Sequence, residues 1–153
     1  MFLTTKQLNI TFKKTNILDS KMQTIVNPVN CVGVMGAGLA LAYRRKYPFM
    51  YQAYRVACKR GELKIGKPWL YKDTTPWILN FPTKDHWRRR SRLSHIKTGL
   101  AYLAKHAAEM GITSLAIPPL GCGLGGLKWA AVLPLIKKYL GPLDIPIEIY
   151  KPR

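Results

Sequence analysis

The chain has 153 residues, 48% of them hydrophobic, and its 25 Lys and Arg against 7 Asp and Glu give a formal net charge of +18. This length and composition predict a single domain over residues 1–153 and exclude a disordered chain. The sequence has no apolar run of roughly 18 residues, as a membrane span requires, and no hydrophobic core of a signal peptide. We therefore expect a cytoplasmic protein with no membrane partner. The charge favours a polyanionic partner, most simply nucleic acid.

Strands and helices alternate along the sequence. Apolar residues that recur every three or four positions between 93 and 110 indicate a long amphipathic helix, for which Ser91 is the predicted N-cap and Gly111 the predicted end. Pro28 is predicted to end the strand before it. The alternation predicts an α/β sandwich around a mixed sheet. The expected strands are 8–12, 23–26, 68–71, 77–81, 114–117 and 145–150, and the expected helices are 39–46, 49–60, 92–110 and 128–140.

The cysteines and histidines give no support for a metal site. Cys31, Cys58 and Cys122 are odd in number and lack C-x-x-C spacing, and the three histidines lack the spacing of a helix-borne zinc site. We therefore predict no disulfide framework, no metal and no cofactor.

Two glycine-rich segments, 33–38 and 121–126, each follow a predicted strand and precede a predicted helix. Backbone N–H groups in such places bind phosphate, and two loops facing one crevice would suit a diphosphate. The alternative is that the glycines serve only tight turns. Segment 121–126 also matches G-x-G-x-x-G, but too little chain follows it for a dinucleotide-binding fold.

Polar and basic residues follow the same predicted strand ends. Asn27 and Asn30 could bind sugar hydroxyls, although asparagines are common in turns. Lys84 follows the end of the predicted strand 77–81. It could act in catalysis as a neutral amine, or it could be one more residue that contacts phosphate. A stacking ring among arginines is typical of single-stranded nucleic-acid binding. The residues of this cluster are Trp87, Arg88, Arg89, Arg90 and Arg92.

Three strings in order, at 26–38, 80–88 and 118–127, resemble the macrodomain family over nearly the whole chain. Within that family the chain is most similar to the DarG-type DNA ADP-ribosyl glycohydrolases. The resemblance implies a three-layer α/β/α sandwich with a mixed central sheet and a cleft for ADP-ribose.

The resemblance also implies roles for individual residues. Lys84 matches a lysine that acts at the anomeric carbon, either by assisting proton transfer or by attacking an opened ribose. Asn30 would hold the distal ribose, with Asn27 supporting the same turn. The ligand-binding residues implied in this way are Asn16, Asn27, Asn30, Gly33, Val34, Met35, Gly36, Ala37, Gly38, Pro119, Gly121, Cys122, Gly123, Leu124 and Gly125.

The implied activity is the removal of ADP-ribose from thymine bases of single-stranded DNA. This reaction would reverse the modification made by a DarT-type toxin, and we expect the protein to be a monomer. One alternative is an ADP-ribose reader without catalysis. Another is a hydrolase of a different linkage, a protein carboxylate ester or ADP-ribose 1″-phosphate. Two positions depart from the family: Asn16 replaces a common aspartate, and Gly125 replaces the acidic residue of the terminal ADP-ribose glycohydrolases.

Overall fold

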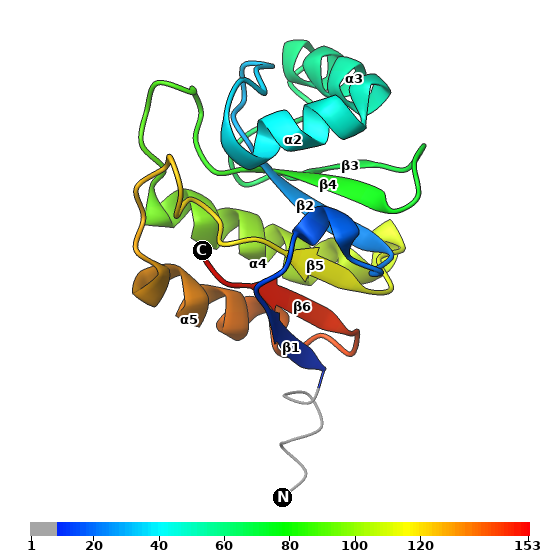
Figure 1. Ribbon diagram of the computed structural model, residues 1–153, viewed down its shortest axis with the longest axis vertical. Helices are drawn as coiled ribbons and strands as arrows, with labels where there is room; N and C mark the ends of the chain where they lie inside the picture. The colour runs from blue at the N-terminus through cyan, green and yellow to red at the C-terminus, as the bar shows by residue number, and fades with distance from the viewer. Residues whose placement is uncertain (1–8) are drawn as a thin grey trace, which may run out of the picture.

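The computed structural model describes residues 9–153, so Leu8, the first residue of the first predicted strand, lies outside the described residues. Six strands form one sheet in the order β1-β6-β5-β2-β4-β3 (Figure 1). All neighbours are parallel except β3, which runs antiparallel to β4, so the sheet is mixed as predicted. The strands are β1 (Ile10–Lys13), β2 (Thr24–Val29), β3 (Trp69–Tyr71), β4 (Trp77–Pro82), β5 (Leu115–Ile117) and β6 (Ile147–Tyr150).

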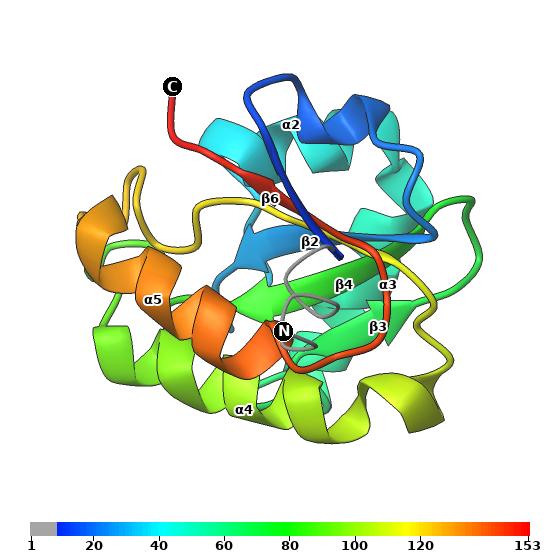
Figure 2. The same cartoon turned by 90° about the horizontal axis from the view of Figure 1, so that it is seen from below.

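Helices cover both faces of the sheet. Helices α4 and α5 pack side by side on one face, and α2 and α3 lie on the other (Figures 1 and 2). This confirms the three-layer α/β/α sandwich. None of the helices between residues 9 and 153 combines the length and hydrophobicity that crossing a bilayer requires. The helices are the 3₁₀ turn η1 (Ile17–Asp19), α2 (Gly38–Lys46), α3 (Pro48–Lys59), α4 (Leu93–Met110) and α5 (Trp129–Leu140).

Side chains alternate between two cores across the central strands. Ile25 on β2 and Ile78 on β4 face α2 and α3, whereas Val26 and Leu79 face α4 and α5, and all four are fully buried. Burial on both faces explains why these strands are almost continuously apolar. The sheet is thereby fixed between two helical layers, and its strand ends provide a rigid rim.

The prediction that Pro28 ends its strand is wrong, because β2 continues through Pro28 to Val29. The Val29 carbonyl accepts from the Thr83 N–H on the β4 side, so alternation turns the Pro28 nitrogen toward β5. Pairing with β5 stops at Ile25, so the missing N–H costs no ladder bond. Asn27 consequently lies inside β2.

Ser91 is not the N-cap of α4, so that prediction is also wrong. Arg92 occupies the cap position, and no side chain caps the helix there. The Ser91 N–H instead donates to the Gly125 carbonyl oxygen at 3.1 Å, and its buried hydroxyl faces the second glycine loop. Gly111 ends α4 with a φ of 83°, as predicted.

Candidate functional site

A cleft of about 930 Å³ opens at the carboxyl ends of β2, β4 and β5, the edge where open α/β sheets bind ligands. Its walls are the loop before α2, the segment between β4 and α4, and the loop after β5. The lining residues are Pro28, Val29, Asn30, Val34, Gly36, Ala37, Gly38, Leu39, Ala40, Thr83, Lys84, Trp87, Arg88, Arg89, Arg90, Pro118, Pro119, Gly121, Gly123, Leu124 and Gly125.

Most of the predicted site residues therefore meet in one place, although they come from three separate segments. Both glycine loops, Asn30, Lys84 and the aromatic–arginine cluster contribute to the lining. The predicted residues that do not line this cleft are Asn16, Asn27, Gly33, Met35, Cys122 and Arg92.

Asn30 organises the loop that follows β2. Its side-chain oxygen accepts from the backbone N–H of Val32 at 3.1 Å and of Val34 at 3.4 Å, and its amide nitrogen donates to the Val34 carbonyl at 2.8 Å. The Tyr54 hydroxyl lies 2.9 Å from the same oxygen. Because an amide has two N–H donors, one remains for a ligand.

Asn27 lies beneath the cleft. It is fully buried, and its amide donates to Asn80 at 3.0 Å and to the Met35 sulfur at 3.7 Å. Met35 is also fully buried. These two residues can support the loop before α2, but they cannot touch a ligand in the cleft.

The N-terminus of α2 supplies the cleft with free N–H donors. Ala37 occupies the cap position, and no side chain caps the helix. Ala37, Gly38, Leu39 and Ala40 all line the cleft. Uncapped N–H groups and the positive end of the helix dipole favour an anion at this point.

The second glycine loop packs tightly against Ser91. A Cβ atom at Gly125 would overlap the Ser91 hydroxyl and approach the Gly121 carbonyl oxygen to 2.6 Å. Gly121 itself has a φ of 71° and would place a Cβ 3.1 Å from the Ser91 Cβ. The loop therefore requires glycine at 125, which explains why no acidic side chain occurs there. Cys122 does not line the cleft, and burial raises the pKa of its thiol.

Lys84 is half-buried at the end of β4, and no carboxylate in the described chain pairs with it. The adjacent Asp85 is held by Arg89 at 2.8 Å. Desolvation acts the other way, but the Arg89 guanidinium and nearby backbone N–H groups lower the pKa of Asp85 below its ordinary value. Among the lining residues from 9–153 there is no Asp, Glu, His or Cys. Lys84 is therefore the one lining group there able to exchange a proton.

Trp87 presents an aromatic face beside the cleft. It is 46% exposed, the Arg88 guanidinium lies 4.8 Å from its ring centroid, and the His86 ring lies 5.1 Å away. This arrangement combines a stacking surface with a phosphate-binding fork. Arg92 lies farther along the segment, at the start of α4.

Asn16 lies in a second hollow of about 310 Å³, which shares Leu39, Pro118 and Pro119 with the main cleft. The two hollows therefore adjoin at these three residues. The Asn16 side-chain oxygen accepts from the Leu18 N–H at 3.0 Å, so this oxygen is already engaged in starting η1.

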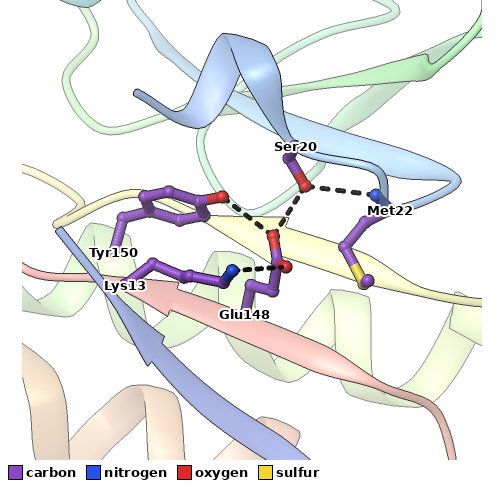
Figure 3. A network of polar contacts seen from close by, with 5 residues as sticks. All are labelled: Lys13, Ser20, Met22, Glu148 and Tyr150. Atoms are coloured by element: carbon purple, nitrogen blue, oxygen red, sulfur yellow. Dashed lines mark hydrogen bonds and ion pairs between the residues drawn. The ribbon is translucent and has the colours of Figure 1, made fainter. Parts of the chain in front are cut away.

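A polar network around Glu148 holds Tyr150, which lines this second hollow (Figure 3). The Tyr150 hydroxyl donates to Glu148 at 2.8 Å, the Ser20 hydroxyl donates to the same oxygen at 2.7 Å, and Lys13 lies 3.7 Å from the other oxygen. Burial and the neighbouring carboxylate raise the pKa of Tyr150, so its hydroxyl stays protonated at neutral pH. Tyr150 lines the hollow, and no sequence motif pointed to it or to Glu148.

Other lining residues were missed because no role in the site was predicted for them. Four of them, Pro28, Val29, Thr83 and Pro118, lie within the strings 26–38, 80–88 and 118–127, and Leu39 and Ala40 directly follow the first string.

The Macro domain family model matches residues 26–136. The DNA ADP-ribosyl glycohydrolase of Mycobacterium tuberculosis is 45% identical over 94% of the chain. A DNA ADP-ribosyl transferase–DNA ADP-ribosyl glycohydrolase fusion protein of Thermosipho africanus is 40% identical, also over 94%. The chain spans only 42% of the length of each of these relatives.

Solved structures of DarG proteins are also similar to this chain. The macrodomain of Thermus aquaticus DarG superimposes with a TM-score of 0.89 at 40% identity, covering 94% of this chain and 98% of that one. Thermosipho africanus DarTG in complex with ADP-ribose gives a TM-score of 0.91 at 42% identity, covering 94% of this chain and 42% of that one.

Proposed function

The chain belongs to the macrodomain family, and on this premise we propose that it is a hydrolase that removes ADP-ribose from a base, thymine, of single-stranded DNA. Its relatives are named as DNA ADP-ribosyl glycohydrolases, which supports this substrate. The observation that carries the proposal is the position of Lys84, half-buried in a cleft whose lining, over residues 9–153, offers no other group to exchange a proton.

We propose one orientation for ADP-ribose across the two adjoining hollows. The diphosphate would lie against the uncapped start of α2, between the two glycine loops. The adenine would extend over Pro118 and Pro119 into the hollow of Asn16 and Tyr150. The distal ribose would then lie near the free N–H of Asn30 and the amine of Lys84.

Two reactions of Lys84 are consistent with this placement. In the first, the Lys84 ammonium donates a proton to the departing base while the C1″–N bond breaks, and water adds to C1″. In the second, the neutral amine attacks C1″ of the opened ribose and forms a Schiff base as the base leaves, and water then releases the sugar. Reduction with borohydride distinguishes them, because only the second leaves ADP-ribose covalently attached to the protein.

The basic segment would hold the DNA that flanks the modified base. Trp87 would stack on a neighbouring base while Arg88 and Arg90 bind phosphates. We further propose that a DarT-type toxin makes the substrate, as the transferase half of the Thermosipho relative's name supports. The unpaired cysteines fit a cytoplasmic location, and we propose a monomer, which light scattering checks.

The test is ADP-ribose release from three substrates: a single-stranded oligonucleotide with ADP-ribosyl thymine, a peptide with an ADP-ribosyl glutamate ester, and ADP-ribose 1″-phosphate. We expect release from the oligonucleotide at a kcat/KM well above that for the other two. Preferential release from the peptide or the phosphate would assign another linkage. Tight ADP-ribose binding without release from any substrate would make the protein a reader.

A further inference from the structure

Helices α2 and α3 carry a second group of positive charges around an aromatic ring. Residues 20–61 contain no Asp or Glu. Arg44 and Arg55 are exposed and form no ion pair within residues 9–153. Their guanidinium carbons lie 4.5 Å and 5.9 Å from the ring centroid of Tyr51. We call these three residues the hairpin cluster.

The loop of residues 31–33 joins the hairpin cluster to the basic segment beside Lys84. On one side, the Cys31 N–H donates to the Asp85 carbonyl at 3.1 Å. On the other side, the Tyr51 hydroxyl donates to the Gly33 carbonyl at 3.4 Å, and Gly33 packs against Arg55, whose Cγ would lie 3.6 Å from a Cβ at that position. The two positive surfaces therefore flank one short loop, whose neighbours in sequence, Asn30 and Val34, line the cleft.

The chemistry of the hairpin cluster favours a nucleic-acid backbone. Stacking on Tyr51 restricts the Arg44 side chain and leaves its N–H edge free for a phosphate. Two guanidinium groups on one ring can therefore bind phosphates with little further loss of side-chain entropy. An acidic peptide would use the charges, but nothing would place it beside a cleft that holds a modified base.

We propose that the hairpin cluster binds single-stranded DNA on one side of the ADP-ribosylated nucleotide, while the segment around Trp87 binds the strand on the other side. The strand would then cross the 31–33 loop, and the modified base would enter the cleft between two anchored flanks. This inference rests on the proposed function for the identity of the polyanion.

The test compares two double variants that each remove two positive charges. Arg44→Gln/Arg55→Gln removes the guanidinium groups of the cluster. Lys137→Gln/Lys138→Gln is the matched control on α5, where both lysines are exposed and Lys138 lies 5.4 Å from the Tyr139 ring. Affinity for unmodified oligothymidylate of about 20 nucleotides, several times the length of a single contact site, is measured by fluorescence anisotropy over a range of salt.

We expect the cluster variant to bind about tenfold more weakly, with a salt slope shallower by about 1.4 for two lost phosphate contacts. The control should stay within about twofold of the parent. A cluster variant that matches the control at every salt concentration would overturn the inference. So would a polyglutamate of equal charge that binds the parent as tightly as the DNA and loses as much in the cluster variant.

Release assays separate this inference from the proposed function. If the parent releases ADP-ribose from DNA while the cluster variant keeps full affinity for long DNA, the surface is wrong and the function stands. If the parent releases nothing but the cluster variant still loses DNA affinity, the function is wrong and the surface stands. Unchanged binding of free ADP-ribose by the cluster variant establishes that its cleft is intact.

Discussion

Asn27 and Asn30 lie three residues apart at the same end of β2, but their amides serve different purposes. The Asn27 amide is buried against Asn80 at 3.0 Å, whereas Asn30 holds the loop that lines the cleft. Asn27→Leu leaves the Asn80 oxygen without its donor, and we expect it to lower the free energy of unfolding by about 1–3 kcal/mol. Urea unfolding measures this.

The double variant Asn27→Leu/Asn80→Leu is the control, because removing both buried partners should cost less than removing one. A double variant less stable than Asn27→Leu alone would show that packing, and not the amide pair, sets the cost.

Asn30→Ala should give the opposite pattern, with the loss in ligand affinity larger than the loss in stability. The side-chain oxygen of Asn30 fixes the Val32 and Val34 N–H groups. Without it the loop must order itself on binding, and we expect ADP-ribose to bind at least about tenfold more weakly. Calorimetric titration checks this; unchanged affinity would rule out Asn30 as the organiser of the loop.

At the scale of elements, the contact between α4 and β4 sets the position of the strand that leads to Lys84. A Cβ atom at Gly99 would overlap the ring of the fully buried Phe81. We therefore expect Gly99→Ala to lower stability by about 1–3 kcal/mol through overpacking. Thermal unfolding provides the measurement.

Replacing the ring should reverse the sign of this effect. In a Phe81→Leu background the overlap disappears, and alanine is a better helix former than glycine by about 1 kcal/mol. Gly99→Ala should therefore be neutral or stabilising there. The same destabilisation in both backgrounds would show that the ring is not the cause.

The elements could be predicted from sequence because their signals are local. The apolar repeat between 93 and 110 and the glycine at 111 gave α4 within one residue of its observed bounds. The prediction for Pro28 failed because the cost of a missing N–H depends on which neighbouring strand the proline nitrogen faces. The Pro28 nitrogen faces β5, and pairing with β5 stops before Pro28. The N-cap prediction for Ser91 failed because its backbone N–H donates to the distant Gly125 carbonyl and its buried hydroxyl packs against that glycine loop. Both errors concern contacts between segments far apart in sequence.

The same limit applies to the candidate site. Lys84, Asn30 and both glycine loops were found through motifs and do line the cleft. Tyr150, which lines the second hollow, and Glu148, which holds it, have no local pattern, since they are joined to Ser20 only through the packing of β6 against the chain after β1 (Figure 3).

For the whole molecule, the net charge of +18 predicts that the proposed binding of DNA depends strongly on salt. If Arg88, Arg90 and Arg92 each neutralise one phosphate, they alone contribute a slope of about −2 to a plot of log K against log salt. Arg89 is left out because Asp85 already pairs with it. Anisotropy at several salt concentrations gives the slope for the parent and for a variant with these three arginines changed to glutamine.

The slope of the triple variant should be shallower than that of the parent by about 2. A parent whose DNA affinity does not change with salt would contradict any role for the basic surface.

The most direct test of the central claim is a single-turnover release assay with the parent, Lys84→Ala and Lys84→Arg on single-stranded DNA that carries ADP-ribosyl thymine. The account predicts that both variants bind free ADP-ribose nearly as well as the parent. Both should release ADP-ribose from the DNA at least about 100-fold more slowly, since positioned proton transfer raises a reaction rate by about 10²–10⁴-fold. Release by Lys84→Ala at the parent rate would contradict it.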